Sequence, residues 1–494
     1  MLKFSNNVLD GVKFCLVFPA YQESDDVISL KVMKQGLGKI PPLSLCAVAG
    51  ILEKFGANVK IIDASADNSS IENTIQKIGL FNPDFLGFTL ATYQFHFTVE
   101  WIKRIKSHIK VPVLVGGPHA RIYPKEILTH RCIDYCILGD AEEVLPRLIY
   151  SIIEKKELSS LGGVAYKINN RIKINRFFLY CNDLDHVPLP SRHLIDNSLY
   201  FSLISKYKNF TAMTSSRGCV FQCTFCDNHC MPYRAMSPKR VVDEMEVCQK
   251  EFFINEIDMF DGIFSLSKKR LVNICAEIIK RKLKVHWSIR TRADLVDQDV
   301  LKQLRRAGCM RIYYGIESGS QKILKNIRKG VTLERISYII RLTKEMGIST
   351  FGYFMVGNYG ENNFTLKETE KIMLTLPLDY IQIAPIFYPP NTENYKELVK
   401  VIKFDYWRKY TINPYSRMEF PIIGTNFNKD QLHSIVRKMY LRFYLRPRNI
   451  VKLLMALKSL DEFIRSARAF YSMFGEILAE AIASNIHKNK KLKD

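Results

Sequence analysis

Short apolar runs alternate with amphipathic stretches in this chain, and this alternation limits the folds open to it more than any other feature. From Phe14 to about Leu148 the runs FCLVFPA, VKIIDA, FLGFTL, VPVLVGG and DYCILGD are separated by segments with helical periodicity. Strands that alternate with helices at this interval build a parallel sheet with helices on both faces. The first part of the chain is therefore predicted to be an open parallel α/β sheet.

The same alternation resumes at Thr211. Amphipathic stretches separate the runs FTAMTSSRG, INEIDMFD, VHWSIRT, RIYYGIES, TFGYFMVG and YIQIAPIF. Six successive strand-helix units predict a partial (β/α)6 parallel barrel, an architecture in which chemistry takes place at the carboxyl ends of the strands. Beyond about Leu398 the pattern changes to amphipathic helices such as QLHSIVRKMYLRFYLRP, so the C-terminal part is predicted to be helical.

A chain of 494 residues exceeds what one hydrophobic core usually serves, so several domains are expected. The changes of pattern mark their boundaries. Between the sheet and the barrel lie a predicted hairpin, GGVAYKINNRIKINR, and a proline-containing segment that cannot continue a helix or a central strand. The predicted domains are 1–150, an open sheet; 151–205, a hairpin and linker; 206–398, a barrel; and 399–494, a helical domain.

Composition narrows the setting. The chain is 47% apolar and 24% charged, as in ordinary globular proteins, and it has no uncharged apolar run of about 18 residues. Its N-terminus lacks the apolar stretch of a secretory signal, so a cytoplasmic location is expected. The net charge of +23 comes from Lys and Arg spread along the chain, which favours a solvated basic surface. Nucleic acid is not an expected partner, whereas peripheral contact between the C-terminal helices and a membrane stays open.

One group of the 12 cysteines is clustered. The segment SSRGCVFQCTFCDN places Cys219, Cys223 and Cys226 after a predicted strand, with three and then two residues between them. Three thiolates on one short loop can hold three irons of a cubane and leave the fourth iron open for chemistry. The alternative is a zinc site with Cys230 as fourth ligand. A closed zinc site usually pairs two Cys-x-x-Cys knuckles, and the sequence contains no second knuckle.

This cysteine spacing resembles the signature of the radical S-adenosylmethionine (radical SAM) superfamily. The resemblance implies that Cys219, Cys223 and Cys226 hold a 4Fe-4S cluster whose fourth iron binds the methionine part of S-adenosylmethionine. Reduction by the cluster then cleaves the cofactor to a 5'-deoxyadenosyl radical. Phe225 matches the aromatic residue that usually lies beside the adenine, and Gly218 lets the loop approach the cluster.

The resemblance continues downstream, in SPKRVVDEME, EIDMFDGIF and HWSIRTRADLVDQDVLKQLRRAGCMRIYYGIESGSQKILKNIRKG. These segments look like the radical domain of cobalamin-binding members of the superfamily. They imply that Asp261 contacts the methionine amine, that Arg290 and Arg292 pair with its carboxylate, and that Glu317 and Ser318 contribute to the same pocket, Glu317 by accepting from a ribose hydroxyl. For Arg290, Arg292 and Glu317 the alternative is an ion pair at the barrel rim.

The segments before Leu148 also carry a resemblance. PPLSLCAVAGILEKFGANVKIIDA, VPVLVGGPHARIYPKEIL and DYCILGDAEEVLPRLI are similar to the Rossmann-like cobalamin-binding domain that precedes the radical domain in this family. Ligands of such sheets bind beyond the carboxyl ends of the strands, so the cobalamin site is expected to include Thr89, Gly116, Gly117, His119 and Gly139. The Asp-x-His-x-x-G motif is absent, and His119 is therefore expected to line the site without ligating cobalt. The alternative is a vestigial domain that binds nothing.

The family resemblance implies an enzyme that uses a 4Fe-4S cluster, S-adenosylmethionine and cobalamin to modify an unactivated carbon, with methylation as the leading expectation. A radical cyclase or rearrangement enzyme of the tetrapyrrole type, such as the anaerobic magnesium-protoporphyrin ester cyclase, is one alternative. A non-catalytic cobalamin- or redox-sensing protein is another. The expected partners are a small-molecule or lipid-like substrate and an electron donor such as flavodoxin or ferredoxin.

Overall fold

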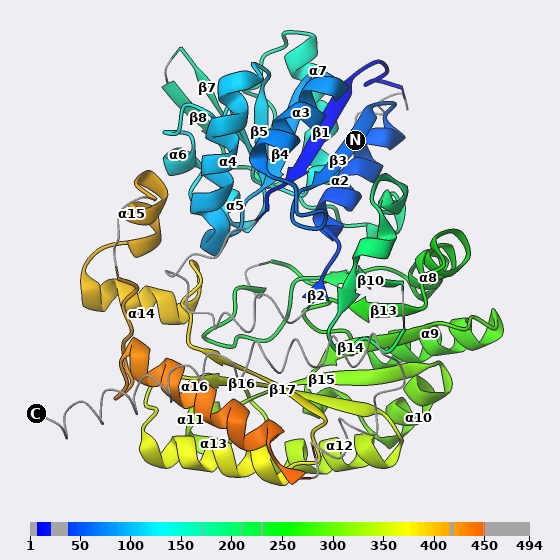
Figure 1. Cartoon of the computed structure of the whole chain (residues 1–494), viewed down its shortest axis with the longest axis vertical. Helices are drawn as coiled ribbons and strands as arrows, with labels where there is room; N and C mark the ends of the chain where they lie inside the picture. Colours follow the sequence, from blue (N-terminus) through cyan, green and yellow to red (C-terminus); the bar gives the residue numbers. More distant parts are fainter. Residues whose placement is uncertain are drawn as a thin grey trace, which may run out of the picture.

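Two parallel sheets organise the chain in the computed structural model. The first sheet and its helices form the upper part of the view in Figure 1, and the second sheet with its helices forms the lower part. Cys230 and the predicted helices beyond residue 450 lie outside the described residues. The structure describes residues 7–20, 38–169, 171–207, 209–228, 231–414, 419–447 and 449.

The first sheet confirms the predicted open parallel architecture. Its strand order is β3-β1-β4-β5-β6-β7-β8, and every pair from β3 to β6 is parallel. The predicted hairpin forms and extends this sheet: β7 pairs antiparallel with β6, and β8 pairs antiparallel with β7. The strands are β1 (Lys13–Phe18), β3 (Asn58–Asp63), β4 (Phe85–Thr89), β5 (Val113–Gly116), β6 (Tyr135–Ile137), β7 (Val164–Ile168) and β8 (Arg171–Asn175).

Both faces of this sheet are buried, which explains why its strands are continuously apolar in sequence. Successive side chains of β1 point to opposite faces, so Phe14 and Leu16 join one hydrophobic cluster while Cys15 and Val17 join another. The first cluster includes α2 and α7, and the second includes α3 to α6. These helices are α2 (Leu43–Lys54), α3 (Ile71–Phe81), α4 (Phe95–His108), α5 (Pro118–Ile122), α6 (Pro124–Ile127) and α7 (Ala141–Ile153).

The second sheet is the predicted partial barrel. Its six strands are all parallel and lie side by side in chain order, β10-β13-β14-β15-β16-β17. The strands are β10 (Phe210–Met213), β13 (Glu256–Met259), β14 (His286–Thr291), β15 (Cys309–Glu317), β16 (Ser349–Val356) and β17 (Tyr380–Pro385).

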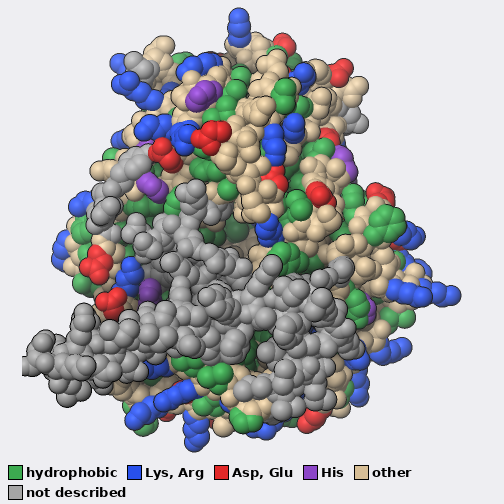
Figure 2. All heavy atoms as spheres, in the orientation of Figure 1, with side chains coloured by type: hydrophobic (Ala, Val, Ile, Leu, Met, Phe, Trp, Pro, Cys, Tyr) green, Lys and Arg blue, Asp and Glu red, His purple; other side chains and the backbone are tan. Residues whose placement is uncertain are grey.

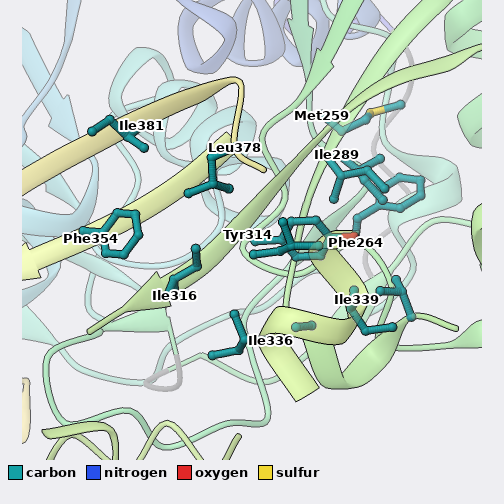
Figure 3. Close-up of a cluster of buried hydrophobic side chains, with 14 of the residues drawn as sticks. Met259, Phe264, Ile289, Tyr314, Ile316, Ile336, Ile339, Phe354, Leu378 and Ile381 are labelled. Atoms are coloured by element: carbon teal, nitrogen blue, oxygen red, sulfur yellow. The ribbon is translucent and has the colours of Figure 1, made fainter. Parts of the chain in front are cut away.

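Helices cover the outside of this barrel, and their apolar faces build its core. Figure 3 shows side chains of β15 (Tyr314 and Ile316), β16 (Phe354) and α12 (Ile336) gathered between the sheet and the helices. Serine, aspartate, threonine or asparagine stands at the N-cap of each of these helices; the Thr332 hydroxyl, for example, accepts a hydrogen bond from the Arg335 N–H at 3.2 Å. The helices are α8 (Pro238–Phe252), α9 (Lys268–Lys280), α10 (Gln298–Arg306), α11 (Gln321–Asn326), α12 (Leu333–Glu345) and α13 (Asn363–Thr375).

In the described part of the chain, three further helices follow the barrel, α14 (Glu393–Ile402), α15 (Tyr406–Ile412) and α16 (Lys429–Tyr444). α16 confirms the helix predicted from its amphipathic pattern. It covers the outer strand β17, because the Tyr440 and Tyr444 hydroxyls accept hydrogen bonds from the Ile383 and Ile381 N–H groups at 2.9 and 3.2 Å. The unpaired backbone groups of an edge strand are thereby satisfied.

Two short antiparallel ribbons complete the described fold, β2 (Gly38–Lys39) with β9 (Phe201–Ser202) and β11 (Ser216–Arg217) with β12 (Arg234–Ala235). Among the described residues, no helix is long and apolar enough to cross a bilayer. Figure 2 shows Lys and Arg side chains dispersed over the visible face with Asp and Glu between them, in keeping with a solvated basic surface.

Candidate cluster and cofactor site

The three clustered cysteines follow β11 on a loop that is fastened to the barrel. Gly218 has φ +77°, and a Cβ placed there would lie 2.4 Å from the Pro232 carbonyl oxygen, so only glycine fits this position. The Cys226 N–H donates to the Cys223 carbonyl at 3.1 Å, which puts these two cysteines on one turn. The Thr224 N–H donates to the Ile327 carbonyl, also at 3.1 Å. The loop is thus fastened to the barrel after its glycine.

Two thiols of this loop, those of Cys223 and Cys226, are at least partly buried, so their thiolate forms need a bound cation beside them. Burial raises the pKa of the Cys226 thiol to about 12. Burial also raises the pKa of Cys223, against the lowering influence of Lys329 and Arg292. A bound metal keeps such thiols deprotonated. The Thr224 hydroxyl is buried without a hydrogen-bond partner among the described residues, as expected beside a site for a bound group.

No three His, Cys, Asp or Glu side chains of the described residues converge in a way that would hold a single metal ion. The thiols that bind a cubane attach to different irons and do not need to converge on one point. The donor set of Cys219, Cys223 and Cys226 therefore fits three corners of an iron-sulfur cluster.

Arg292 faces this loop from the end of β14. Its guanidinium donates to the Asp294 carboxylate, from Nε to Oδ1 at 2.9 Å and from Nη2 to Oδ2 at 2.8 Å. Its Cζ lies 3.9 Å from the centre of the Phe221 ring. The remaining nitrogen, Nη1, lies 4.0 Å from the Cys223 sulfur. Because Asp294 occupies the fork that was expected to pair with a cofactor carboxylate, the group that Arg292 offers to the site is Nη1.

The other predicted polar residues also have partners within the protein. The Arg290 guanidinium pairs with both carboxylate oxygens of Asp258, at 2.8 and 3.0 Å, which is the barrel-rim ion pair described as the alternative. The Ser318 hydroxyl lies 3.0 Å from that of Thr369, and both residues are buried. The structure brings these residues to the carboxyl ends of β14 and β15, while their contacts with a cofactor stay predictions.

Glu317 ends β15 in a special conformation. Its φ is +67°, a value that non-glycine residues rarely adopt, and the register between β15 and β16 shifts beside it. Its carboxylate accepts a hydrogen bond from the Lys329 ammonium at 2.8 Å, and both side chains are at least nine-tenths buried. A strained, buried ion pair at a strand end is typical of functional sites.

Asp261 is completely enclosed behind the cluster loop. Its carboxylate accepts hydrogen bonds from the Ser215 N–H and hydroxyl, each at 2.6 Å, and from the Ser216 hydroxyl at 2.8 Å. Burial raises its pKa. These bonds fix the segment that leads into β11, so the observed contacts of Asp261 support the loop. The predicted aromatic Phe225 is half-buried and packs against the barrel core.

Lys329 and Phe221 are the site residues that sequence reasoning missed. Both stand in segments that carried the family resemblance, IRKG and CVFQC, but neither position has a pattern that sets it apart. Lys329 lies 12 residues from Glu317, and only the turn after α11 brings the two side chains together. A lysine within a basic segment is more often solvated, and its burial was the missing information.

The predicted cobalamin-site residues lie at one edge of the first sheet. Thr89 and Gly116 are register partners at the carboxyl ends of β4 and β5. Gly117 has φ +100°, and a Cβ there would lie 2.9 Å from the Leu90 carbonyl oxygen. At Gly139 a Cβ would lie 2.6 Å from the Leu179 carbonyl oxygen, so this glycine admits the protein's own chain. Ligands of such sheets bind at this carboxyl edge, and binding of cobalamin by these residues stays a prediction.

His119 is buried between the first sheet and α15. Its Nδ1 lies 3.1 Å from the Thr92 hydroxyl and its Nε2 lies 2.9 Å from the Thr411 hydroxyl. Burial lowers its pKa to about 3, so the ring is neutral. Both ring nitrogens are therefore engaged, which gives His119 a role in joining α15 to the sheet, while its place in the cobalamin site stays a prediction.

Glu361, in the turn after β16, makes stability depend on pH. The side chain is 1% exposed, and burial raises its pKa from 4.5 to about 7 although the Gly357 N–H donates to it. The folded state binds this proton more tightly than the unfolded state, so the stabilisation is complete below pH 4.5 and is lost as pH rises toward 7. We expect Glu361→Gln to flatten the fall in thermal midpoint across this window. An unchanged slope would show that another group titrates.

The comparisons with known proteins agree with this geometry. Residues 213–373 match the family model of the Radical SAM superfamily, and residues 31–149 match that of the B12 binding domain. An uncharacterized methyltransferase of Pyrococcus horikoshii is 30% identical over 428 residues, which cover 83% of this chain and 89% of the relative. The anaerobic magnesium-protoporphyrin IX monomethyl ester cyclase of Rubrivivax gelatinosus is 28% identical and is covered to 74%, again across 83% of this chain.

Among solved structures, the radical S-adenosylmethionine methyltransferase TsrM of Kitasatospora setae is similar, with a TM-score of 0.64 at 19% identity. The match covers 79% of this chain and 75% of that one, so the two share their fold. The sequence relative, the two matched family models and the three-cysteine loop all point to one family. The chain belongs to the cobalamin-binding radical SAM enzymes, a family that uses a 4Fe-4S cluster, S-adenosylmethionine and cobalamin.

Proposed function

We propose that this enzyme methylates an unactivated carbon of a small-molecule substrate. The observation that carries the proposal is the direct contact between the two cofactor regions. Arg217, two residues before Cys219, donates a hydrogen bond of 2.5 Å to Glu142. Glu142 lies three residues after Gly139, at the edge expected to bind cobalamin. This contact joins the segment before the cluster loop to the edge expected to bind cobalamin. Such an arrangement suits transfer of a methyl group from cobalamin to a substrate radical.

The relatives support methylation as the reaction. The relative with 30% identity is named a methyltransferase, and a cytidylyl-2-hydroxyethylphosphonate methyltransferase of Streptomyces wedmorensis is 23% identical over 368 residues. When bound, the cluster with S-adenosylmethionine supplies a radical that removes hydrogen from carbon, and cobalamin supplies the methyl group.

The chain's own residues hold and enclose these groups. Cys219, Cys223 and Cys226 would bind the cluster, Phe225 would lie beside the adenine, and Glu317 would accept from a ribose hydroxyl. Burial of the Glu317 and Lys329 side chains keeps bulk water from this side of the site. The edge formed by Thr89, Gly116, Gly117 and Gly139 would receive the corrin ring.

The experiment is anaerobic reconstitution of the full chain with iron and sulfide, followed by addition of hydroxocobalamin, S-adenosylmethionine and a strong reductant. We expect the spectrum of a 4Fe-4S cluster, bound cobalamin and formation of 5'-deoxyadenosine. With a substrate, we expect a methylated product and S-adenosylhomocysteine beside 5'-deoxyadenosine. Iron-loaded protein that never cleaves the cofactor would instead indicate the non-catalytic sensing alternative.

A radical cyclase is the second candidate, because the Rubrivivax gelatinosus cyclase matches over the same share of this chain as the methyltransferase does. The Rubrivivax gelatinosus cyclase is named for a porphyrin ester, and a structure of TsrM contains tryptophan as substrate; both are flat and largely apolar molecules. Tetrapyrroles and indoles are therefore the first substrates to test. A cyclised product without S-adenosylhomocysteine would decide for cyclisation. A flavodoxin or ferredoxin of the cytoplasm is the proposed electron donor.

A further inference from the structure

Four charged side chains connect the cluster loop to the first sheet. Arg217 and Arg234 stand opposite each other on β11 and β12, the ribbon from which the cluster loop emerges. Asp140 and Glu142 lie at the start of α7, directly after β6. The Arg217 guanidinium lies 2.5 Å from Glu142 and 3.3 Å from Asp140, and Arg234 lies 2.5 Å from the same Asp140 oxygen. We call these four residues the interdomain ion cluster.

The interdomain ion cluster is shielded from solvent. The side chains of Arg234, Glu142 and Asp140 are 6%, 10% and 13% exposed, and that of Arg217 is 27% exposed. Two arginines opposite each other on a ribbon repel, so the ribbon depends on the two carboxylates of the other domain. Charges paired at this depth interact more strongly than surface pairs and tolerate little displacement.

The backbone of Cys181, in the segment after the hairpin, also contacts this ion cluster. The Cys181 N–H donates to Asp140 at 3.0 Å, and the Cys181 carbonyl accepts from Arg234 at 2.8 Å. Asp140 therefore receives donors from the segment after the hairpin and from both strands of the ribbon. The geometry is fixed from three directions, which a pair of flexible surface charges does not achieve.

The two ends of the interdomain ion cluster lie beside the two cofactor regions. Arg217 is followed directly by Gly218, where a side chain would collide with the Pro232 carbonyl, and then by Cys219. Asp140 follows Gly139 at the carboxyl edge of the first sheet. A shift at either end is expected to move a cofactor-binding segment, because one residue separates Arg217 from Cys219 and Asp140 follows Gly139 directly.

We propose that the interdomain ion cluster sets the position of the iron-sulfur loop relative to the cobalamin-binding edge. Its members are positioning residues, since they contact each other and not the reacting atoms. This inference rests on the two cofactors of the family and not on methyl transfer, so it stands or falls independently of the proposed reaction. The competing interpretation is that these ion pairs only contribute to folding stability.

The test measures the magnetic interaction between the two cofactors, which depends on the distance between them. Full-length protein is loaded with iron, sulfide and hydroxocobalamin, and cobalamin is reduced to its paramagnetic Co(II) state. Reduction of the 4Fe-4S cluster then speeds spin relaxation of Co(II) through a dipolar interaction that falls steeply with distance. This readout needs neither substrate nor turnover, and the thermal midpoint and the bound iron and cobalamin are measured on the same samples.

We expect Glu142→Arg, which places a third positive charge beside Arg217, to lose most of this relaxation enhancement while both cofactors stay bound. Glu142→Gln, which preserves shape, should lose part of it. Arg217→Glu combined with Glu142→Arg restores opposite charges and should recover the enhancement. The matched control is Glu126→Arg, which breaks the ion pair of Glu126 with Arg408 of α15 (3.1 Å). This pair also joins the first sheet domain to the C-terminal region, and its loss should leave the enhancement unchanged.

The proposal is overturned if Glu142→Arg keeps the wild-type enhancement with both cofactors bound, or if the Glu126→Arg control loses as much. Failure of the charge exchange to restore the enhancement counts against it too. Loss of iron from Glu142→Gln at an unchanged thermal midpoint would likewise overturn it, because the ion cluster would then be needed to form the loop and not to place it.

Discussion

Replacing Cys223 with alanine should abolish the 4Fe-4S cluster and, with it, formation of 5'-deoxyadenosine. In the proposed site each of the three thiolates would hold one iron, and Cys223 is buried, at 8% exposed. The loss should reach the detection limit, since cofactor cleavage needs the electron that the cluster delivers. Iron and sulfide analysis, the visible spectrum and the nucleoside product after anaerobic reconstitution measure the effect.

The matched control is Cys132→Ala, which changes a half-buried thiol of the first domain. This variant should keep full iron content and full cofactor cleavage. Zinc at the loop of the wild-type protein after anaerobic preparation, or a cluster that survives Cys223→Ala, would contradict the assignment of this cysteine.

Replacing Lys329 with methionine should destabilise the barrel by about 3–5 kcal/mol, the usual cost of leaving one partner of a buried ion pair uncompensated. The Glu317 carboxylate is 10% exposed and has the Lys329 ammonium as its 2.8 Å partner. Without this partner, its negative charge would stand beside the cluster loop in a poorly solvated position. A fall in the thermal midpoint of the barrel transition, together with weaker binding of S-adenosylmethionine, measures the change.

Two variants test the cause. Lys329→Met combined with Glu317→Gln removes both charges and should regain most of the stability, as a double-mutant cycle detects. Arg328→Met, at the adjacent position, breaks an ion pair with Glu393 whose members are 55% and 41% exposed, and should cost less than about 1 kcal/mol. Equal losses for Lys329→Met and Arg328→Met would rule out burial as the reason.

Much of the fold was determined by sequence pattern alone. The continuous apolar run of β1 predicted a strand buried on both faces, and Phe14 and Cys15 indeed join different cores. The amphipathic spacing predicted α16. These elements were predictable because periodicity records which side of a local element is buried, and that information is carried by neighbouring residues.

The same holds for part of the site. The spacing of Cys219, Cys223 and Cys226 predicted a loop that holds iron, and the structure places this loop at the carboxyl ends of the barrel strands, beside Arg292. Thr89 and Gly116 were assigned to one edge of the first sheet, and they are register partners there. Both predictions used residues whose position on a strand end follows from the fold class.

Partners across the fold were decided only by the tertiary structure. Arg292 has Asp294 in its fork, Glu317 pairs with Lys329, and Arg217 reaches Glu142, which lies 75 residues away in sequence. His119 bonds Thr411 across 292 residues. Sequence shows which side chains are charged but not which of them meet, because the strength of a charge pair depends on distance and burial, and both are set only when separate elements pack together.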